Sequence, residues 1–185
     1  MRIFGIDPGS DRTGYGCVET NGSRHRIITS GAITAPTAAS FPDKLLNIHR
    51  RLAALLGEYR PDCVAIENVF FAANARSALK LGHARGVAML AAVEAGLEVV
   101  EYTPTEVKRA VVGYGRAEKH QVQQMVTLVL GLDHRPTPHD AADALAVAIC
   151  HVHSAGPQRA RQLLASARTA GKGLTSWRRY RPARS

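Results

Sequence analysis

Residues 2–20 read RIFGIDPGSDRTGYGCVET: an apolar run that ends in Asp7, a turn, and then a second run rich in β-forming residues. The first run predicts a buried strand over 2–7, and the second predicts a strand over 13–20. The intervening Asp-Pro-Gly-Ser is typical of a tight turn. A carboxylate therefore stands at the end of a strand that is otherwise apolar.

Outward from this stretch, the chain predicts an α/β fold. Asn21-Gly22 indicates a hairpin that leads into a third strand. The expected strands are 2–7, 13–20, 24–34, 62–67 and 97–102, and the expected helices are 42–59, 75–95, one from Pro104, one around 122–130, and 138–153. Three strands followed by alternating helices and strands favour an antiparallel start and parallel crossovers, with helices on both faces.

Three further carboxylates accompany Asp7. Glu67 ends the strand at 62–67, and Asp140 and Asp143 lie about 60° apart on the last helix. Asp7 and Glu67, each taken alone, are explained equally well as turn caps, and Asp140 is explained as a helix cap, whereas Asp143 has no such structural explanation. Together, at one sheet edge, they would supply the hard oxygen ligands that select Mg²⁺ or Mn²⁺. Two such ions can cut a phosphodiester, so the pattern indicates a nuclease.

The charge is unevenly distributed. Eight of the 24 lysines and arginines, and none of the 15 acids, lie in 154–185. We therefore expect one nuclease domain over 1–153 and a basic, flexible tail over 154–185. Such a tail binds nucleic acid through phosphates or serves only solubility, and the sequence leaves both open.

Cysteine usage and hydropathy suggest a cytoplasmic protein. The three cysteines, an odd number without a C-x-x-C motif, lie in apolar runs, so we expect them to be reduced and buried. Asp7 interrupts the N-terminal apolar run, which argues against a signal peptide. No stretch approaches the ~20 apolar residues of a membrane span.

Several other positions have two interpretations. Phe70 would either stack on a base or anchor its loop. Lys108 and Lys119 flank a glycine-rich break and would either clamp a phosphate or lie on a solvated surface. Gly82 and Gly86 allow close helix approach, inside the domain or across a dimer interface.

Four blocks, residues 5–16, 66–82, 117–122 and 140–146, resemble the RuvC family of Holliday-junction resolvases. The resemblance implies an RNase H-like fold with a mixed five-stranded sheet flanked by helices. It also implies a homodimer that nicks two symmetry-related strands of a four-way DNA junction in recombination and repair, leaving 5′-phosphate and 3′-hydroxyl ends. A branch-migration complex, RuvA–RuvB, is the implied partner.

The same resemblance implies roles for individual residues. The residues that match the catalytic set are Asp7, Glu67, Asp140, Asp143 and Lys119, and those that match DNA contacts are Phe70, Lys80, Lys108 and Lys119. The four acids would bind two Mg²⁺ ions, with Mn²⁺ as a substitute. Some members carry His where this chain has Asp140; His139 is one residue away, so its role stays open.

Three rival functions remain at this point. Asp7-Pro8-Gly9-Ser10 also matches the first phosphate loop of ATP-binding proteins of the actin and sugar-kinase type, although no second loop follows. A junction-binding protein without catalysis and an RNA-directed nuclease of the same fold are the other two.

Overall fold

The computed structural model describes residues 1–68 and 74–170, with side chains through residue 155. It divides into two compact units, 1–153 and 154–185. The strands are β1 (Arg2–Asp7), β2 (Arg12–Thr20), β3 (His25–Thr34), β4 (Cys63–Glu67) and β5 (Glu98–Tyr102); the helices are α1 (Phe41–Tyr59), α2 (Ala75–Glu94), α3 (Pro104–Val112), α4 (Lys119–Val129) and α5 (His139–Ala170). The predicted order of strands and helices is confirmed.

The five strands form one mixed sheet in the order β3-β2-β1-β4-β5. β1, β2 and β3 are antiparallel, whereas β1, β4 and β5 run parallel. The predicted hairpin is present with a four-residue loop, in which Asn21 Oδ1 accepts hydrogen bonds from the backbone N–H groups of Ser23 and Arg24 at 3.2 and 2.9 Å. As expected for parallel strands, the carboxyl ends of β1 and β4 meet at one edge.

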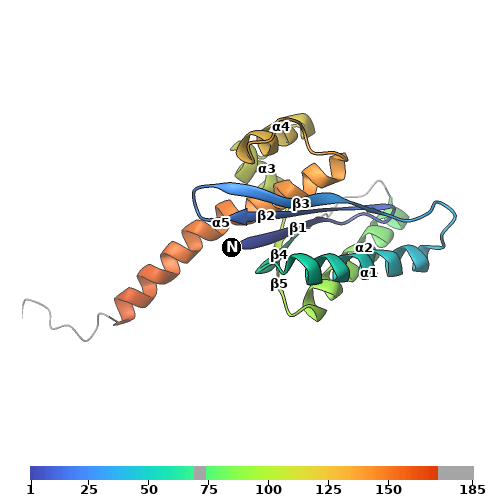
Figure 1. Ribbon diagram of the computed structural model, residues 1–185, viewed down its shortest axis with the longest axis horizontal. Coiled ribbons are helices and arrows are strands. Elements are labelled where there is room, and N and C mark those ends of the chain that lie inside the picture. Colours follow the sequence, from blue (N-terminus) through green and yellow to red (C-terminus); the bar gives the residue numbers. More distant parts are fainter. Residues whose placement is uncertain (69–73, 171–185) are drawn as a thin grey trace, which may run out of the picture. The chain divides into compact units, whose positions relative to one another are not determined.

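Alternate residues of the strands enter two separate cores. Ile3 and Ala65 pack with α3, α4 and α5, whereas Phe4 and its neighbours pack with α1 and α2. Figure 1 shows α1 and α2 on one side of the sheet and α3 and α4 on the other. Because strand side chains alternate between faces, Asp7 and Glu67 continue the series of Ile3 and Ala65 and face the α5 side.

Two glycines let α5 lie directly against the sheet. A Cβ atom at Gly5 would lie 2.0 Å from the carbonyl oxygen of Ala144, and one at Gly14 would lie 2.1 Å from that of Asp140. Gly14 is also the β2 partner of Asp7. The close approach therefore brings the first turns of α5 beside the end of β1.

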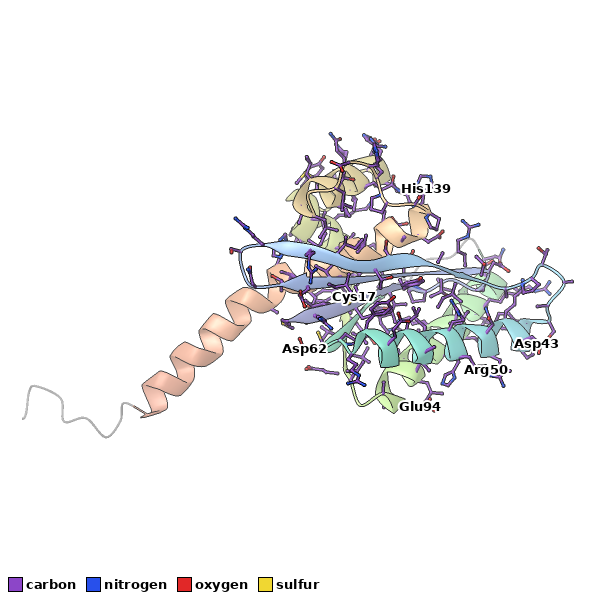
Figure 2. The ribbon with its side chains drawn as sticks, in the orientation of Figure 1. Cys17, Asp43, Arg50, Asp62, Glu94 and His139 are labelled. Carbon is purple, nitrogen blue, oxygen red and sulfur yellow. The ribbon has the colours of Figure 1, made fainter. Side chains whose placement is uncertain are left out.

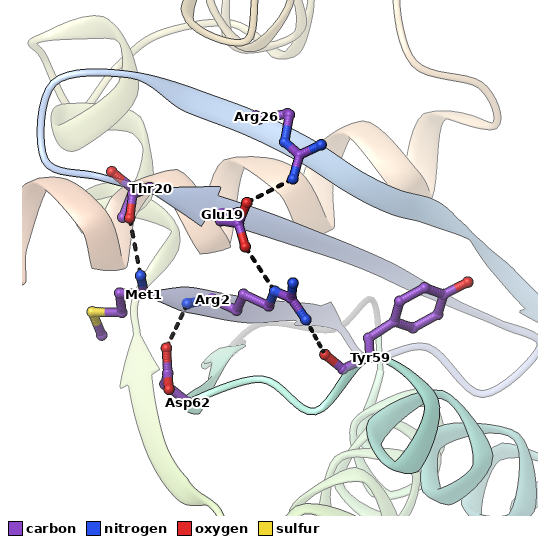
Figure 3. Close-up of polar contacts among 7 residues, drawn as sticks. All are labelled: Met1, Arg2, Glu19, Thr20, Arg26, Tyr59 and Asp62. Atoms are coloured by element: carbon purple, nitrogen blue, oxygen red, sulfur yellow. Dashed lines mark hydrogen bonds and ion pairs between the residues drawn. The ribbon is translucent and has the colours of Figure 1, made fainter.

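The opposite edge of the sheet is held by a polar network around Arg2 (Figure 3). The Arg2 guanidinium bonds Glu19 at 2.8 Å and donates to the Tyr59 carbonyl at 3.2 Å, and its backbone N–H donates to Asp62 at 2.6 Å. Glu19 also pairs with Arg26 at 2.7 Å. These contacts connect β1, β2, β3 and the α1–β4 turn, far along β1 from Asp7.

The last helix is longer than predicted. The prediction that the last helix ends at 153 is wrong, because α5 continues to Ala170. Good helix formers dominate 158–168 and outweigh the unfavourable effect of Pro157 on a helix. All three cysteines are buried and none of them forms a disulfide, as predicted. Within the described residues, no helix combines the length and apolar character needed to span a bilayer.

Candidate active site

A pocket of about 320 Å³ opens where β1, β4 and α5 meet. Its polar lining comes from Asp7, Glu67, Asp143, Lys108 and Lys119, and its apolar lining from Pro104, Val107, Val122 and Ala146. β1 supplies Asp7 and β4 supplies Glu67, because adjacent parallel strands have their carboxyl ends at the same edge of the sheet. The structure thus brings together five of the residues singled out from the sequence.

Asp7 and Glu67 are partly buried and hydrogen-bond to one another. Burial raises the pKa of Asp7 from 3.8 to about 8, and the nearby charges of Glu67 and Asp143 add to the rise. Burial also raises the pKa of Glu67, although the hydrogen bond with Asp7 opposes that rise. A partly buried carboxyl pair of this kind favours a shared proton or a bound cation.

The other two acids have basic partners. Asp143 pairs with Lys119 at 2.6 Å, and this hydrogen bond raises the pKa of Lys119. Asp140 pairs with Arg12 at 3.4 Å and still lies close enough to act on the Asp7 charge. Sequence reasoning missed Arg12, because its position five residues after Asp7 did not show that β2 would carry it to Asp140.

The donor set fits a divalent cation. All four acids offer carboxylate oxygens, which are the ligands that Mg²⁺ and Mn²⁺ prefer. Within the described residues, no three His, Cys, Asp or Glu side chains are arranged so that together they could hold a metal ion. Instead the acids divide into the Asp7–Glu67 pair and two acids bonded to Lys119 and Arg12. The Asp7–Glu67 pair, in which two partly buried carboxyl groups contact one another, is the part of the site that a cation would stabilise most.

Lys80 and His139 lie outside this pocket. Lys80 does not line the pocket; its Nζ is 5.6 Å from the ring centroid of Phe41. Phe70 falls outside the described residues. His139 does not line the pocket either, and its ring contacts Gln123.

Comparison with known proteins gives consistent matches. The family described as crossover junction endodeoxyribonuclease RuvC matches residues 3–151. The protein of that name from Pelobacter propionicus is 52% identical over 182 residues, covering 98% of this chain and all of that protein. The one from Citrifermentans bemidjiense is 55% identical over 156 residues, covering 84% of this chain and 94% of that protein.

Solved structures agree with the fold. Thermus thermophilus RuvC in complex with a Holliday junction substrate has a TM-score of 0.80 and 37% identity, over 84% of this chain and 94% of that one. The yeast mitochondrial Holliday junction resolvase Ydc2 has a TM-score of 0.56 at 14% identity, over 82% of this chain and 78% of that one, and supports the fold alone. The mixed five-stranded sheet with helices on both faces is RNase H-like.

Proposed function

Because the chain belongs to the RuvC family of crossover junction endodeoxyribonucleases, we propose that its acidic pocket cuts four-way DNA junctions by paired, symmetric nicks. The observation that carries this proposal is the convergence of Asp7, Glu67 and Asp143 with two lysines in one pocket. Carboxylates suit metal-assisted hydrolysis, and lysines suit a polyanionic substrate. The products would be 5′-phosphate and 3′-hydroxyl ends.

The four acids would hold two Mg²⁺ ions, for which Mn²⁺ would substitute. Bound there, the metal would supply Lewis-acid stabilisation and a nucleophilic water at neutral pH. Asp7 and Glu67 would provide the most buried ligands, because both face the pocket from adjacent strand ends. Asp140 and Asp143 would complete the set from α5.

Lys119 and Lys108 would act on the DNA phosphate. Lys119 sits at the pocket rim, bonded to Asp143, and would offset negative charge that develops on the phosphorus oxygens. Lys108, from α3, lines the same pocket and would hold the backbone beside it. Phe70 and Lys80 remain proposed DNA contacts on the family resemblance alone, as does the partnership with RuvA–RuvB.

A four-way junction is the natural test substrate. With Mg²⁺, the protein should introduce paired nicks at symmetric positions in a labelled mobile junction, and a ligase should reseal the products. EDTA should abolish the nicks, because carboxylates alone supply no electrophile. Binding without nicks would support a noncatalytic junction protein, and equal cutting of an RNA junction would overturn the preference for DNA.

A homodimer would match the two-fold symmetry of the junction, and α2 offers the surface. Ala84 and Ala88 face the core, whereas Leu79, Leu90 and Val93 are 65%, 51% and 63% exposed. A Cβ atom at Gly82 or Gly86 would meet nothing within 4 Å, so these glycines do not serve packing inside the domain. A shallow apolar groove follows the same face of the helix.

Leu90→Glu should therefore convert the dimer to a monomer and replace paired nicks with single, unpaired ones. Placing two charges at a self-complementary interface is strongly unfavourable, since each copy contributes one. Light scattering after size exclusion measures the mass. Leu128→Glu is the matched control, because Leu128 is 66% exposed but lies on α4. A Leu90→Glu protein that remains dimeric would exclude this face as the interface.

A further inference from the structure

Two polar contacts join α4 to α5, one helical turn apart. Lys119, the first residue of α4, bonds Asp143 at 2.6 Å. Gln123, one turn later on α4, contacts His139, one turn earlier on α5, through Nε2 and Nδ1 at 3.1 Å. Each helix supplies residues four apart, which lie on the same face. The two contacts therefore lie next to one another along the interface between the antiparallel helices α4 and α5.

The Gln123–His139 contact is buried on the α4 side. Gln123 is only 5% exposed, although it is polar. A buried amide is nearly always hydrogen-bonded, and its nitrogen only donates. With the Gln123 nitrogen as donor, His139 Nδ1 is the acceptor of this contact. Figure 2 shows His139 at the start of α5, on the side of the sheet where α4 lies.

Apolar contacts hold α4 against the core, and contacts of this kind have no preferred direction. Val122 and Val126 pack into the core, but apolar burial is non-directional and tolerates small rotations or shifts of a helix. The preceding segment includes Gly113 at φ 100°, and the Lys119 side chain is 62% exposed on a long, flexible stem. A hydrogen bond has a preferred direction, so the Gln123–His139 contact one turn away would fix the position at which α4 places Lys119.

We propose that Gln123 and His139 are positioning residues, which set the register between α4 and α5 and thereby hold Lys119 against Asp143. This inference rests on the proposed nuclease function and deepens it. Neither side chain lines the pocket, so neither touches the reacting phosphate.

The test is single-turnover cleavage of the four-way junction with enzyme in excess, beside junction affinity. Gln123→Met keeps the length of the side chain and removes its donor. It should slow cleavage about 10- to 100-fold, since small misplacements of a reacting group cost this much, while affinity stays within about twofold. Gln124→Met is the matched control, because Gln124 is the exposed neighbour on α4. An unchanged rate in Gln123→Met would overturn the inference.

A second pair of variants distinguishes positioning from simple support of the fold. His139→Ala should reproduce the loss, whereas His139→Asn should recover part of the rate, because an amide oxygen can accept from Gln123. His139 is exposed, so both variants should fold even if Gln123→Met does not. Equal rates for the Ala and Asn variants would count against a hydrogen bond as the cause.

A double-mutant cycle tests the route through Lys119. Combined with Lys119→Met, the Gln123→Met change should cost little more, because the group that it positions is gone. Fully additive losses would show that Gln123 acts by another route and would overturn the inference. Cleavage by the parent protein, and its dependence on Asp7, separately test the proposed function, so the two can fail independently.

Discussion

Asp7→Asn should slow junction cleavage by at least about 1000-fold while leaving junction affinity within about threefold. Asn keeps the shape of the side chain, but it offers one neutral oxygen where the pocket has a charged carboxylate beside Glu67 and Asp143. DNA affinity depends mainly on cations that contact phosphates, and these are unchanged. Rate and affinity are measured on one labelled junction in Mg²⁺.

Thermal unfolding in EDTA gives a second readout for the same variant. The pKa of Asp7 is raised by burial, so its contribution to stability is complete below 3.8 and is lost as the pH rises towards about 8. Asn carries no such charge. The variant should therefore unfold at a higher temperature than the parent near pH 8, and the difference should vanish in acid.

Asp11→Asn is the matched control for both readouts. Asp11 lies four residues further on, is 77% exposed at its side chain and pairs with Lys44 at 2.6 Å, outside the pocket. It should cut at the parental rate and gain no stability at high pH. If Asp7→Asn lost affinity as much as cleavage, or unfolded at a lower temperature, Asp7 would be a structural residue instead.

Gly5→Ala should destabilise the protein by at least about 3 kcal/mol, which corresponds to roughly 6–12 °C in Tm for a chain of this size. The added Cβ would lie 2.0 Å from the Ala144 carbonyl oxygen and 2.9 Å from the Ala148 backbone nitrogen. Both atoms belong to the helix backbone, so α5 itself would have to move. Urea and thermal unfolding measure the loss.

Gly57→Ala provides the opposite expectation under the same conditions. Gly57 lies inside α1, and a Cβ there would meet nothing within 4 Å. Alanine forms helices better than glycine, so a gain of about 0.5–1 kcal/mol is expected. If both substitutions changed the free energy of unfolding by the same amount, the close contact between β1 and α5 would not explain why residue 5 is a glycine.

Much of the site could be predicted from the sequence because it follows from periodicity. An acid at the end of an apolar run marks a strand end, and parallel strands bring such ends to one edge, as Asp7 and Glu67 show. Asp143 followed from its spacing along the last helix. The pocket confirms that these three acids converge, together with Lys119.

Features that depend on register between distant elements could not be predicted. The contacts of Arg12 with Asp140 and of Gln123 with His139 join residues 128 and 16 positions apart, and no local pattern records them. The continuation of α5 past Pro157 could not be predicted, because Gly156-Pro157 and the helix formers that follow it indicate opposite outcomes. Lys80 shows the converse, since its place in a matching block did not bring it into the pocket.

The contact between Gly5 and α5 has a mechanical consequence for the site. Where side chains separate a helix from a sheet, their rotamers can absorb small displacements; here backbone meets backbone, and close-packed interiors transmit strain. Asp7 and Glu67 on the strands therefore keep a fixed distance from Asp140 and Asp143 on the helix. This spacing is set when the protein folds. Adjustment to a substrate must come from long side chains that line the pocket, such as Lys119, whose side chain is 62% exposed.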